Sequence, residues 1–192
     1  DALEGEKSVI NVVDPAPAQF PSKTAVDRAM DVLKSAKKPL IILGKGASYA
    51  QCDDVVKEFV EKSGVPYIAM SMAKGLLPDD HPQYAGAARS LVLKESDCVM
   101  LVGARLNWLL SHGKGKQWGE PHSKKFIQID IDPAVIGLNR PVDLGILADA
   151  KSALGALLEA VKAKTPPREE LADLARYRQL SAQTMAEGMG YM

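Results

Sequence analysis

The residues of this chain that suggest chemistry are two glycines around a lysine, one arginine and two aspartates. Gly44, Lys45 and Gly46 follow four consecutive apolar residues, a pattern typical of a buried parallel strand that turns tightly into a helix. Glycines at such a turn let the backbone approach a ligand closely, and free N–H groups at a helix start favour an anion, usually a phosphate. The turn therefore predicts a phosphate-binding loop, with a simple tight connection as the alternative.

The glycine turn departs from the dinucleotide fingerprint G-x-G-x-x-G. Tyr49 stands where the third glycine belongs, and the next predicted strand, Tyr67 to Met70, does not end in an acid placed for a ribose. Both departures argue against an NAD-binding domain.

The other candidates each stand at the end of a predicted strand. Arg105 is expected to clamp a phosphate or stack on a base, unless it is an exposed loop arginine. The Asp130 carboxylate is suited to ribose hydroxyls or, alternatively, to an Asx turn at the strand end. Asp149 either joins this site or caps the following helix. Lys45 faces a phosphate or is simply solvated, and Lys114 is interpreted as part of a surface loop.

Hydrophobic periodicity indicates the elements that position these residues. Strands are expected at 40–43, 67–70, 98–102, 126–131 and 142–147, and helices at 23–36, from the glycine turn to about 62, at 87–95, and around 154–161. Alternating strands and helices predict an α/β fold, a Rossmann-like parallel sheet with helices on both faces. Ligands of such sheets bind beyond the carboxyl ends of the strands, where all the candidates lie.

The chain divides into one domain and two connecting segments. Residues 1–22 contain the proline-rich run DPAPAQFP and are interpreted as an interdomain linker from a preceding domain. Residues 23–165 form a central, nucleotide-binding type of α/β domain. Residues 166–192 are a helical linker toward a following domain.

Composition excludes several classes of function. Lys and Arg together number 24, as do Asp and Glu. The chain therefore lacks the net positive charge that is typical of nucleic-acid-binding proteins. No apolar run approaches the roughly 20 residues of a membrane span. The three histidines and two isolated cysteines lack metal-ligand spacing, and the cysteines suit a reduced, cytoplasmic protein. We identify no catalytic residue and no metal ligand, because no nucleophile–base motif is present.

Five segments together resemble a known family. The order IILGKGA, MAKGLLPDDHP, VGARLNW, HGKGKQWG and FIQIDID is similar to the middle domain of thiamine-diphosphate-dependent enzymes. Within that family, GKGASYAQCDD and GARLNWLLSHGKGKQWG are most similar to oxalyl-CoA decarboxylases. The 2-hydroxyacyl-CoA lyases share the general pattern less closely.

The resemblance implies a fragment of a longer lyase that converts oxalyl-CoA to formyl-CoA and carbon dioxide. Thiamine diphosphate and Mg²⁺ would be held by the two flanking domains, not by this one, so the fragment alone is expected to be inactive. The implied partners are ADP, a CoA thioester, those two domains and further copies of the chain in a dimer or tetramer.

The resemblance also implies roles for individual residues. ADP, as an activator, would contact Lys45, Arg105 and Asp130 together with Gly44, Gly46, Ile131 and Asp149. Part of the CoA nucleotide would contact Gly86, Arg89 and Ser90. Three alternatives remain. The chain could come from a 2-hydroxyacyl-CoA lyase or from an acetohydroxyacid-synthase-like enzyme, in which FAD occupies the nucleotide site or the site is empty. It could also be a free-standing nucleotide-binding regulatory module.

Overall fold

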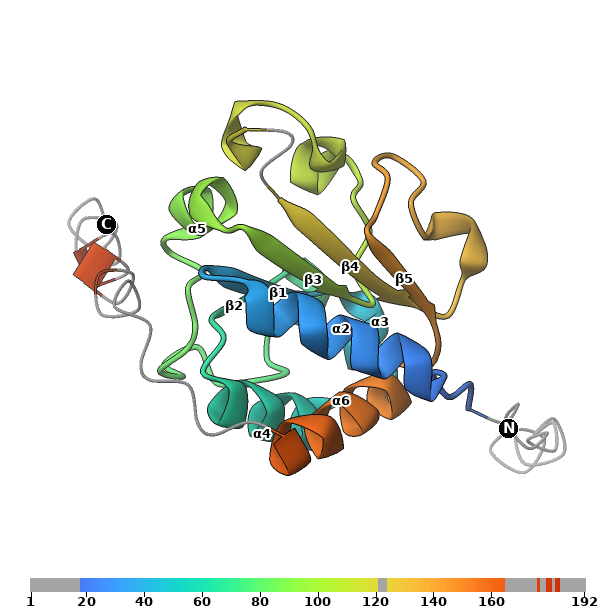
Figure 1. The fold of residues 1–192 in the computed structure, drawn as a ribbon. Helices are drawn as coiled ribbons and strands as arrows, with labels where there is room; N and C mark the ends of the chain where they lie inside the picture. The colour runs from blue at the N-terminus through green and yellow to red at the C-terminus, as the bar shows by residue number, and fades with distance from the viewer. Residues whose placement is uncertain (1–17, 121–123, 165–175, 177–178, 181, 184–192) are drawn as a thin grey trace, which may run out of the picture.

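A five-stranded, fully parallel sheet forms the centre of the protein (Figure 1). The computed structural model describes residues 18–120 and 124–164, with residues 176, 179, 180, 182 and 183 near the end of the chain. The strands are β1 (Pro39–Leu43), β2 (Tyr67–Ala69), β3 (Cys98–Val102), β4 (Lys125–Asp130) and β5 (Leu144–Leu147), in the spatial order β2-β1-β3-β4-β5. The predicted α/β fold with a parallel sheet is confirmed.

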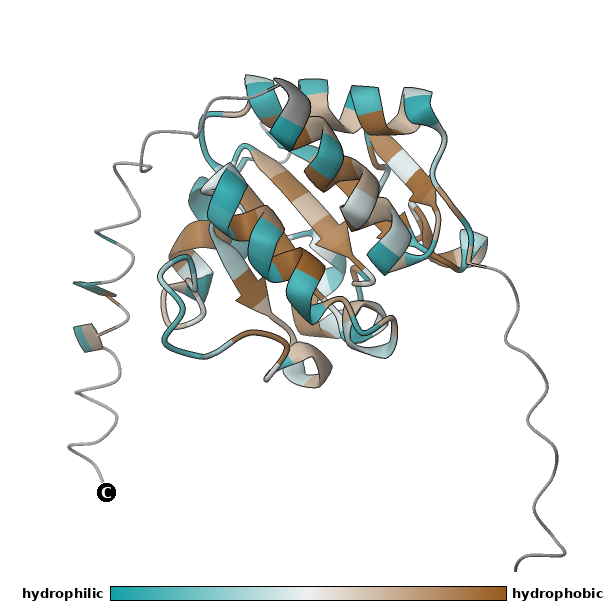
Figure 2. Cartoon of the chain, turned by 90° about the horizontal axis from the view of Figure 1, so that it is seen from below, coloured by the Kyte–Doolittle hydropathy of each residue, from teal (hydrophilic) through white to brown (hydrophobic). Residues whose placement is uncertain are grey.

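Helices and turns cover both faces of this sheet. The α-helices are α2 (Lys23–Ser35), α3 (Lys45–Tyr49), α4 (Asp53–Ser63), α5 (Arg89–Glu95) and α6 (Ala150–Lys164). Four short 3₁₀ turns are η1 (Ser71–Ala73), η2 (Trp108–Gly113), η3 (Lys116–Trp118) and η4 (Pro133–Val135). One apolar core lies between the sheet and α2, α4 and α6, and a smaller one lies under α5 and η3. Figure 2 shows the brown, apolar strands behind helices that turn teal, polar residues outward.

Local sequence accounts for most of these elements. Ser22 begins α2 by accepting a hydrogen bond from the Ala25 amide at 3.2 Å, as a capping serine does. Every residue of β1 and of β3 is buried, because both faces of these central strands are covered. Gly64 ends α4 in the left-handed conformation at φ 65°. Among the described residues, no helix is both long enough and apolar enough to cross a bilayer.

The single helix expected after the glycine turn is instead two helices. Gln51 adopts φ 50° and separates α3 from α4. This turn buries the Cys52 side chain completely and lets α4 begin at the acids Asp53 and Asp54, which favour a helix start. The linker expected at 1–22 lies outside the described residues up to position 17, and so does most of 166–192.

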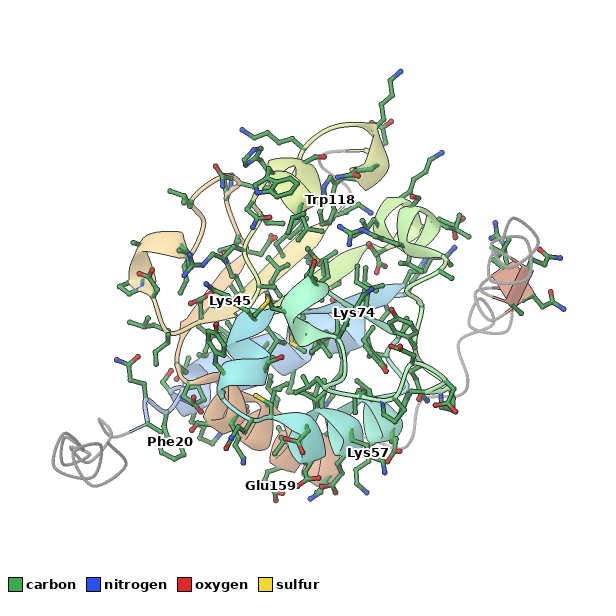
Figure 3. All side chains as sticks on the ribbon, turned by 180° about the vertical axis from the view of Figure 1, so that it is seen from behind. Phe20, Lys45, Lys57, Lys74, Trp118 and Glu159 are labelled. Atoms are coloured by element: carbon green, nitrogen blue, oxygen red, sulfur yellow. The ribbon has the colours of Figure 1, made fainter. Side chains whose placement is uncertain are left out.

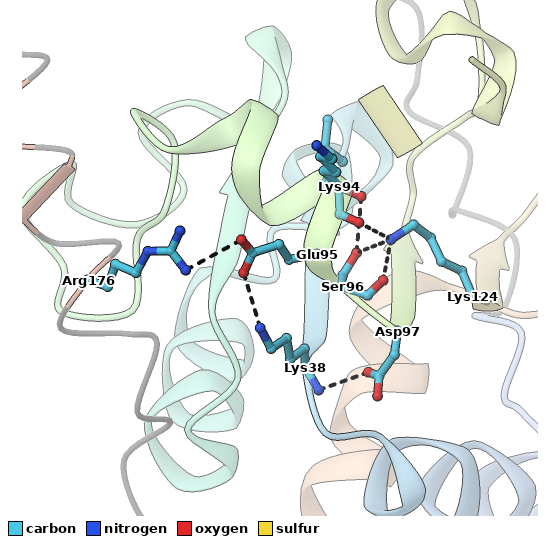
Figure 4. A network of polar contacts seen from close by, with 8 residues as sticks. Lys38, Lys94, Glu95, Ser96, Asp97, Lys124 and Arg176 are labelled. Carbon is cyan, nitrogen blue, oxygen red and sulfur yellow. Dashed lines mark hydrogen bonds and ion pairs between the residues drawn. The ribbon is translucent and has the colours of Figure 1, made fainter. Parts of the chain in front are cut away.

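A polar network at the amino edge of the sheet fixes α5 (Figure 4). Lys124 is buried and donates from Nζ to the carbonyls of Lys94 (2.9 Å) and Ser96 at the end of that helix. Burial lowers the pKa of Lys124 to about 8. Glu95 forms ion pairs with Lys38 (3.1 Å) and Arg176 (3.4 Å). The network holds α5 against the sheet from the side opposite to the candidate site.

Three glycines allow the turn after β1 to touch the turn after β3. A Cβ added at Gly46 would lie 2.7 Å from the Gly103 Cα, and one added at Gly103 would lie 2.5 Å from the Gly46 Cα. A Cβ added at Gly44 would overlap the Gly103 carbonyl oxygen. Gly103 also adopts φ 55°, which side chains rarely tolerate. The two turns therefore pack backbone against backbone.

A Gly103→Ala substitution is expected to destabilise the fold more than a Gly75→Ala substitution. Both glycines have positive φ (55° and 86°), but no atom lies within 4 Å of a Cβ added at Gly75. The control therefore carries only the backbone strain, about 1–3 kcal/mol, whereas Gly103→Ala adds a clash with Gly46. Urea unfolding of both variants measures the difference in free energy. Equal losses would show that the close approach of the two turns is not needed.

His81 is a buried histidine that folding keeps neutral. Its side chain is 5 % exposed, Nδ1 accepts from the Gln83 amide at 3.2 Å, and Nε2 lies 3.7 Å from a Glu61 carboxylate oxygen. Burial lowers the pKa of His81, and the Glu61 carboxylate opposes that shift only in part. The unfolded chain therefore binds a proton more readily than the folded one.

This difference predicts a loss of stability in weak acid. Above the ordinary histidine pKa of 6.5, His81 is neutral in both states. As the pH falls below 6.5, His81 is protonated first in the unfolded state, and this lowers the free energy of the unfolded state relative to the folded one. The free energy of unfolding, measured in urea at pH 7.5 and at pH 5.5, should fall on acidification. A His81→Gln variant should show a smaller fall. An identical fall in the variant would mean that other groups cause the acid sensitivity.

Candidate functional site

A cavity at the carboxyl edge of the sheet lies where the strand order reverses. From β1 the chain crosses to β2 on one side, and the following strand, β3, pairs with β1 on the other side. Residues after the ends of β1, β2 and β3 enclose a cavity of ≈ 250 Å³, lined by Gly44, Lys45, Met70, Met72, Arg105 and Leu109 among others. Such a reversal is where open parallel sheets bind ligands.

The backbone amides of the glycine turn are already used within the protein. The Gly44 amide donates to the Val102 carbonyl (3.0 Å), the Gly46 amide to the Gly103 carbonyl (3.0 Å) and the Ala47 amide to the Gly44 carbonyl (3.1 Å). The expectation of free N–H groups at these three positions is therefore wrong. The glycines serve the contact between the two turns, and these three amides are not available to an anion.

Two cationic side chains line the cavity. Lys45 is exposed, and its Nζ lies 6.0 Å from the centre of the Tyr49 ring (Lys45 is labelled in Figure 3). The Arg105 side chain is 46 % exposed, and its Nη2 lies 3.8 Å from Asp132 Oδ2. That distance is too long for a hydrogen bond, so the ion pair is weak. Both cations can reach an anion placed over the ends of β1 and β3.

The two aspartates of the predicted site have local backbone partners. Asp130 is 7 % exposed and its Oδ1 accepts from the Asp132 amide at 3.0 Å, as in an Asx turn. Asp149 Oδ1 accepts from the Ser152 amide at 2.9 Å and caps the start of α6. Ile131 is 60 % exposed. The cavity thus gathers Gly44, Lys45 and Arg105, whereas Gly46, Asp130, Ile131 and Asp149 lie outside its lining.

Arg89 supports the cavity from behind. Its Nη2 donates to the Leu109 carbonyl at 2.7 Å, and its Nη1 lies 3.7 Å from the Met70 sulfur. Met70 and Leu109 both line the cavity. Of the segment expected to contact CoA, Ser90 is exposed and Gly86 packs against the Tyr84 ring. Arg89 is the residue of this segment that reaches the cavity wall.

The wall formed by residues 107–113 is strained and externally anchored. Ser111, His112 and Gly113 have φ of 46°, 54° and 70° in succession, a left-handed run that two of these residue types disfavour. Trp118 Nε1 donates to the Leu110 carbonyl (2.8 Å) and Arg140 Nη1 to the Gly113 carbonyl (2.7 Å). These donors, with Arg89, hold the strained loop in place.

Sequence reasoning missed the apolar half of the cavity. Met70, Met72 and Leu109 line it, and Met72 and Leu109 are 58 % and 38 % exposed. The available signal was their position just after strand ends, but apolar residues there are usually assigned to the core. A ligand for this cavity must therefore combine an anionic part with a flat or apolar part.

Among residues 18–120 and 124–164, no group of three or more His, Cys, Asp and Glu side chains could hold a metal ion.

Comparison with known proteins agrees with this architecture. Residues 26–157 match the family model for the thiamine pyrophosphate enzyme central domain. The chain is 46 % identical over 162 residues to the oxalyl-CoA decarboxylase of Escherichia coli K12, covering 84 % of the chain and 28 % of that protein. It is 42 % identical over 140 residues to the 2-hydroxyacyl-CoA lyase of Arabidopsis thaliana, covering 73 % and 24 %.

A solved structure extends the comparison to three dimensions. It is described as a thiamin diphosphate-dependent enzyme from Mycobacterium smegmatis, and it superposes with a TM-score of 0.66 at 27 % identity. The match covers 84 % of this chain and 32 % of that one. The chain therefore spans about a quarter of the length of the curated relatives it matches. It belongs to the thiamine pyrophosphate enzyme family and corresponds to the central domain of those enzymes.

Proposed function

We propose that the chain is the central domain of a thiamine-diphosphate-dependent carbon–carbon lyase that converts oxalyl-CoA to formyl-CoA and carbon dioxide. The observation that carries this proposal is the 46 % identity to the Escherichia coli oxalyl-CoA decarboxylase across 84 % of the chain. The identities to 2-hydroxyacyl-CoA lyases are lower, at 42 % for Arabidopsis thaliana and 39 % for Homo sapiens.

Thiamine diphosphate and Mg²⁺ belong, in this proposal, to two other domains of the longer protein. When bound, the cofactor accepts the electron pair that carbon dioxide leaves behind. The match of residues 26–157 to the central domain of these enzymes supports a role other than holding that cofactor. Residues 1–22 and 166–192 would connect this central domain, 23–165, to the two flanking domains. The complete protein would act in the cytoplasm as a dimer or tetramer.

The domain itself would bind ADP as an activator at the carboxyl edge of the sheet. Lys45 and Arg105 line the cavity there and would face the two phosphates over Gly44 and Gly46. The ribose would lie toward the end of β4, where Asp130 is nearly buried and Asp132 is half exposed beside Arg105. Ile131 and Asp149 would contact the remainder of the nucleotide. The apolar residues Met72 and Leu109 suit a flat base or ribose better than bulk water.

The CoA thioester would approach the segment that begins α5. Ser90 is exposed there, next to Gly86, and can meet a nucleotide of CoA directly. Arg89 donates to the Leu109 carbonyl, so its contribution would be to hold the wall shared with the ADP cavity. The two nucleotides would then lie on opposite sides of one loop.

A 2-hydroxyacyl-CoA lyase is the second candidate. It would use the same cofactor on a different acyl group, and its support is the match to such enzymes at 38–42 % identity in plants and mammals. This candidate predicts the same central domain, so the acyl group must be tested on the complete protein. An acetohydroxyacid-synthase-like enzyme would bind FAD in place of ADP. Measuring the affinity of the parent protein for each nucleotide distinguishes this alternative from the main proposal.

The reaction can be tested on the parent protein with thiamine diphosphate and Mg²⁺ supplied. Formyl-CoA should appear from oxalyl-CoA, whereas the 192-residue chain under the same conditions should produce none. The second expectation follows from the proposal that the two flanking domains hold the cofactor. Cleavage of a 2-hydroxyacyl-CoA without turnover of oxalyl-CoA would favour the second candidate. Formyl-CoA release by the 192-residue chain alone would show that the cofactor assignment is wrong.

ADP binding can be tested by calorimetry on the parent protein. Arg105→Ala should weaken ADP affinity about tenfold or more, because a charge-assisted hydrogen bond contributes about 1.5–3 kcal/mol. Asp130→Asn should weaken it less, since that side chain is already bonded to the Asp132 amide. Lys114→Ala is the control, because this exposed lysine does not line the cavity. Unchanged affinity in both Arg105→Ala and Asp130→Asn would refute the proposed site.

A further inference from the structure

A second cavity lies on the other side of Arg105. It has a volume of ≈ 220 Å³ and is enclosed by the loop after β3, by Gln128 in β4 and by the loop around η4. Arg105 and Asn107 line both this cavity and the one assigned above to ADP, so these two residues form the partition between them. The proposed ADP contacts leave the second cavity without a role.

The polar residues of the second cavity are held rigidly. Gln128 is 1 % exposed; its Oε1 accepts from the Gly137 amide at 2.9 Å, and its Nε2 donates to the Val135 carbonyl at 3.1 Å. Asn139 Nδ2 donates to the Leu106 carbonyl at 2.8 Å. Each bond ties one wall of the cavity to another. A cavity fixed in this way loses little entropy when a ligand binds.

The charged side chains that line this cavity are both positive. Arg140 donates to the Gly113 carbonyl, and its guanidinium carbon lies 4.4 Å from the centre of the Phe126 ring. Burial is the largest influence on Arg140 and lowers its pKa, opposed by the Asp143 carboxylate. Arg140 and Arg105 thus place two guanidinium groups around one cavity whose lining contains no acid.

Two carboxylates that act on these arginines, those of Asp132 and Asp143, lie outside the lining and also bind backbone amides. Asp132 pairs weakly with Arg105 at 3.8 Å, and its Oδ1 accepts from the Ala134 amide at 2.9 Å. Asp143 Oδ2 accepts from the Phe126 amide at 2.7 Å. These carboxylate oxygens already bind backbone donors. The lining itself therefore contributes two cationic side chains and no acidic one.

The geometry points to a second, separate anion site here, which takes a small organic oxyanion, a phosphate ester or a carboxylate. The two guanidiniums suit an oxyanion head group, and Val135, Leu106 and Leu138 supply an apolar wall for a short carbon portion. The volume equals that of about seven waters at about 30 Å³ each, which is enough for a phosphate or carboxylate with a short carbon portion. The inference does not require that ADP bind in the first cavity.

Leu138 provides a variant pair that leaves the interior intact. It lines the cavity and is 68 % exposed, so Leu138→Glu places a carboxylate at the mouth, and Leu138→Gln places a neutral side chain of the same shape there. Lys45→Met locates the bound anion, because Lys45 lines only the first cavity. If anion binding is weaker in Leu138→Glu but not in Leu138→Gln, the added negative charge at the second cavity is the cause.

The test is calorimetric titration of the full 192-residue chain with inorganic phosphate and, separately, with malonate, at constant ionic strength. At least one of the two anions should bind with a Kd on the order of 1 mM. Leu138→Glu should weaken binding several-fold, Leu138→Gln should leave it unchanged, and the weakening by Leu138→Glu should persist when Lys45 is also replaced by methionine. Tighter phosphate binding assigns a phosphate ester, and tighter malonate binding assigns a carboxylate.

Two results would overturn the inference. One is that neither anion binds the folded wild-type chain at tens of millimolar. The other is that Lys45→Met weakens binding while Leu138→Glu does not, which would put the anion in the first cavity. Because ADP is absent from these titrations, a failure here is distinct from a failure of the proposed ADP site.

Discussion

The contact between the Gly44–Gly46 turn and Gly103 is the constraint on which the rest of the site depends. Side chains at these positions would collide with backbone atoms of the opposite turn, so both turns must be built from glycine. Their closeness lets the Gly44 and Gly46 amides bond to carbonyls of residues 102 and 103. Lys45 and Arg105, which follow the same two turns, both line the cavity. The backbone contact sets where those cations stand relative to each other.

A second theme is the use of fixed donors to hold loops around these cavities. The carbonyls of Leu109, Leu110 and Gly113 accept from Arg89, Trp118 and Arg140, respectively. A left-handed non-glycine residue costs about 1–3 kcal/mol, and a hydrogen bond contributes about 0.5–1.5 kcal/mol, more from a charged donor. The three hydrogen bonds thus contribute a free energy comparable in magnitude with the strain at Ser111 and His112. Anchors at α5 and η3 allow the loop to keep a shape that its own sequence disfavours.

Much of the fold could be predicted from local sequence, and less of the site. The buried runs of β1 and β3, the Ser22 cap and the apolar stripe of α2 are all short-range signals. The break at Gln51 was not predictable, because nothing nearby marks a left-handed glutamine. The pairing of the Gly44 and Gly46 amides was missed because it depends on Gly103, which is far away in the sequence. Asp130 and Asp149 were partly predictable, because the Asx turn noted as an alternative for Asp130 and the helix cap noted for Asp149 describe their observed bonds.

We propose that this domain binds ADP between the turns that follow β1 and β3. A structure of the parent protein determined with saturating ADP tests it most directly. The account predicts density for the diphosphate within hydrogen-bonding distance of Lys45 and Arg105, with the ribose toward the end of β4. Density for ADP at any other surface of the domain, or a cavity that stays without nucleotide under those conditions, would contradict it.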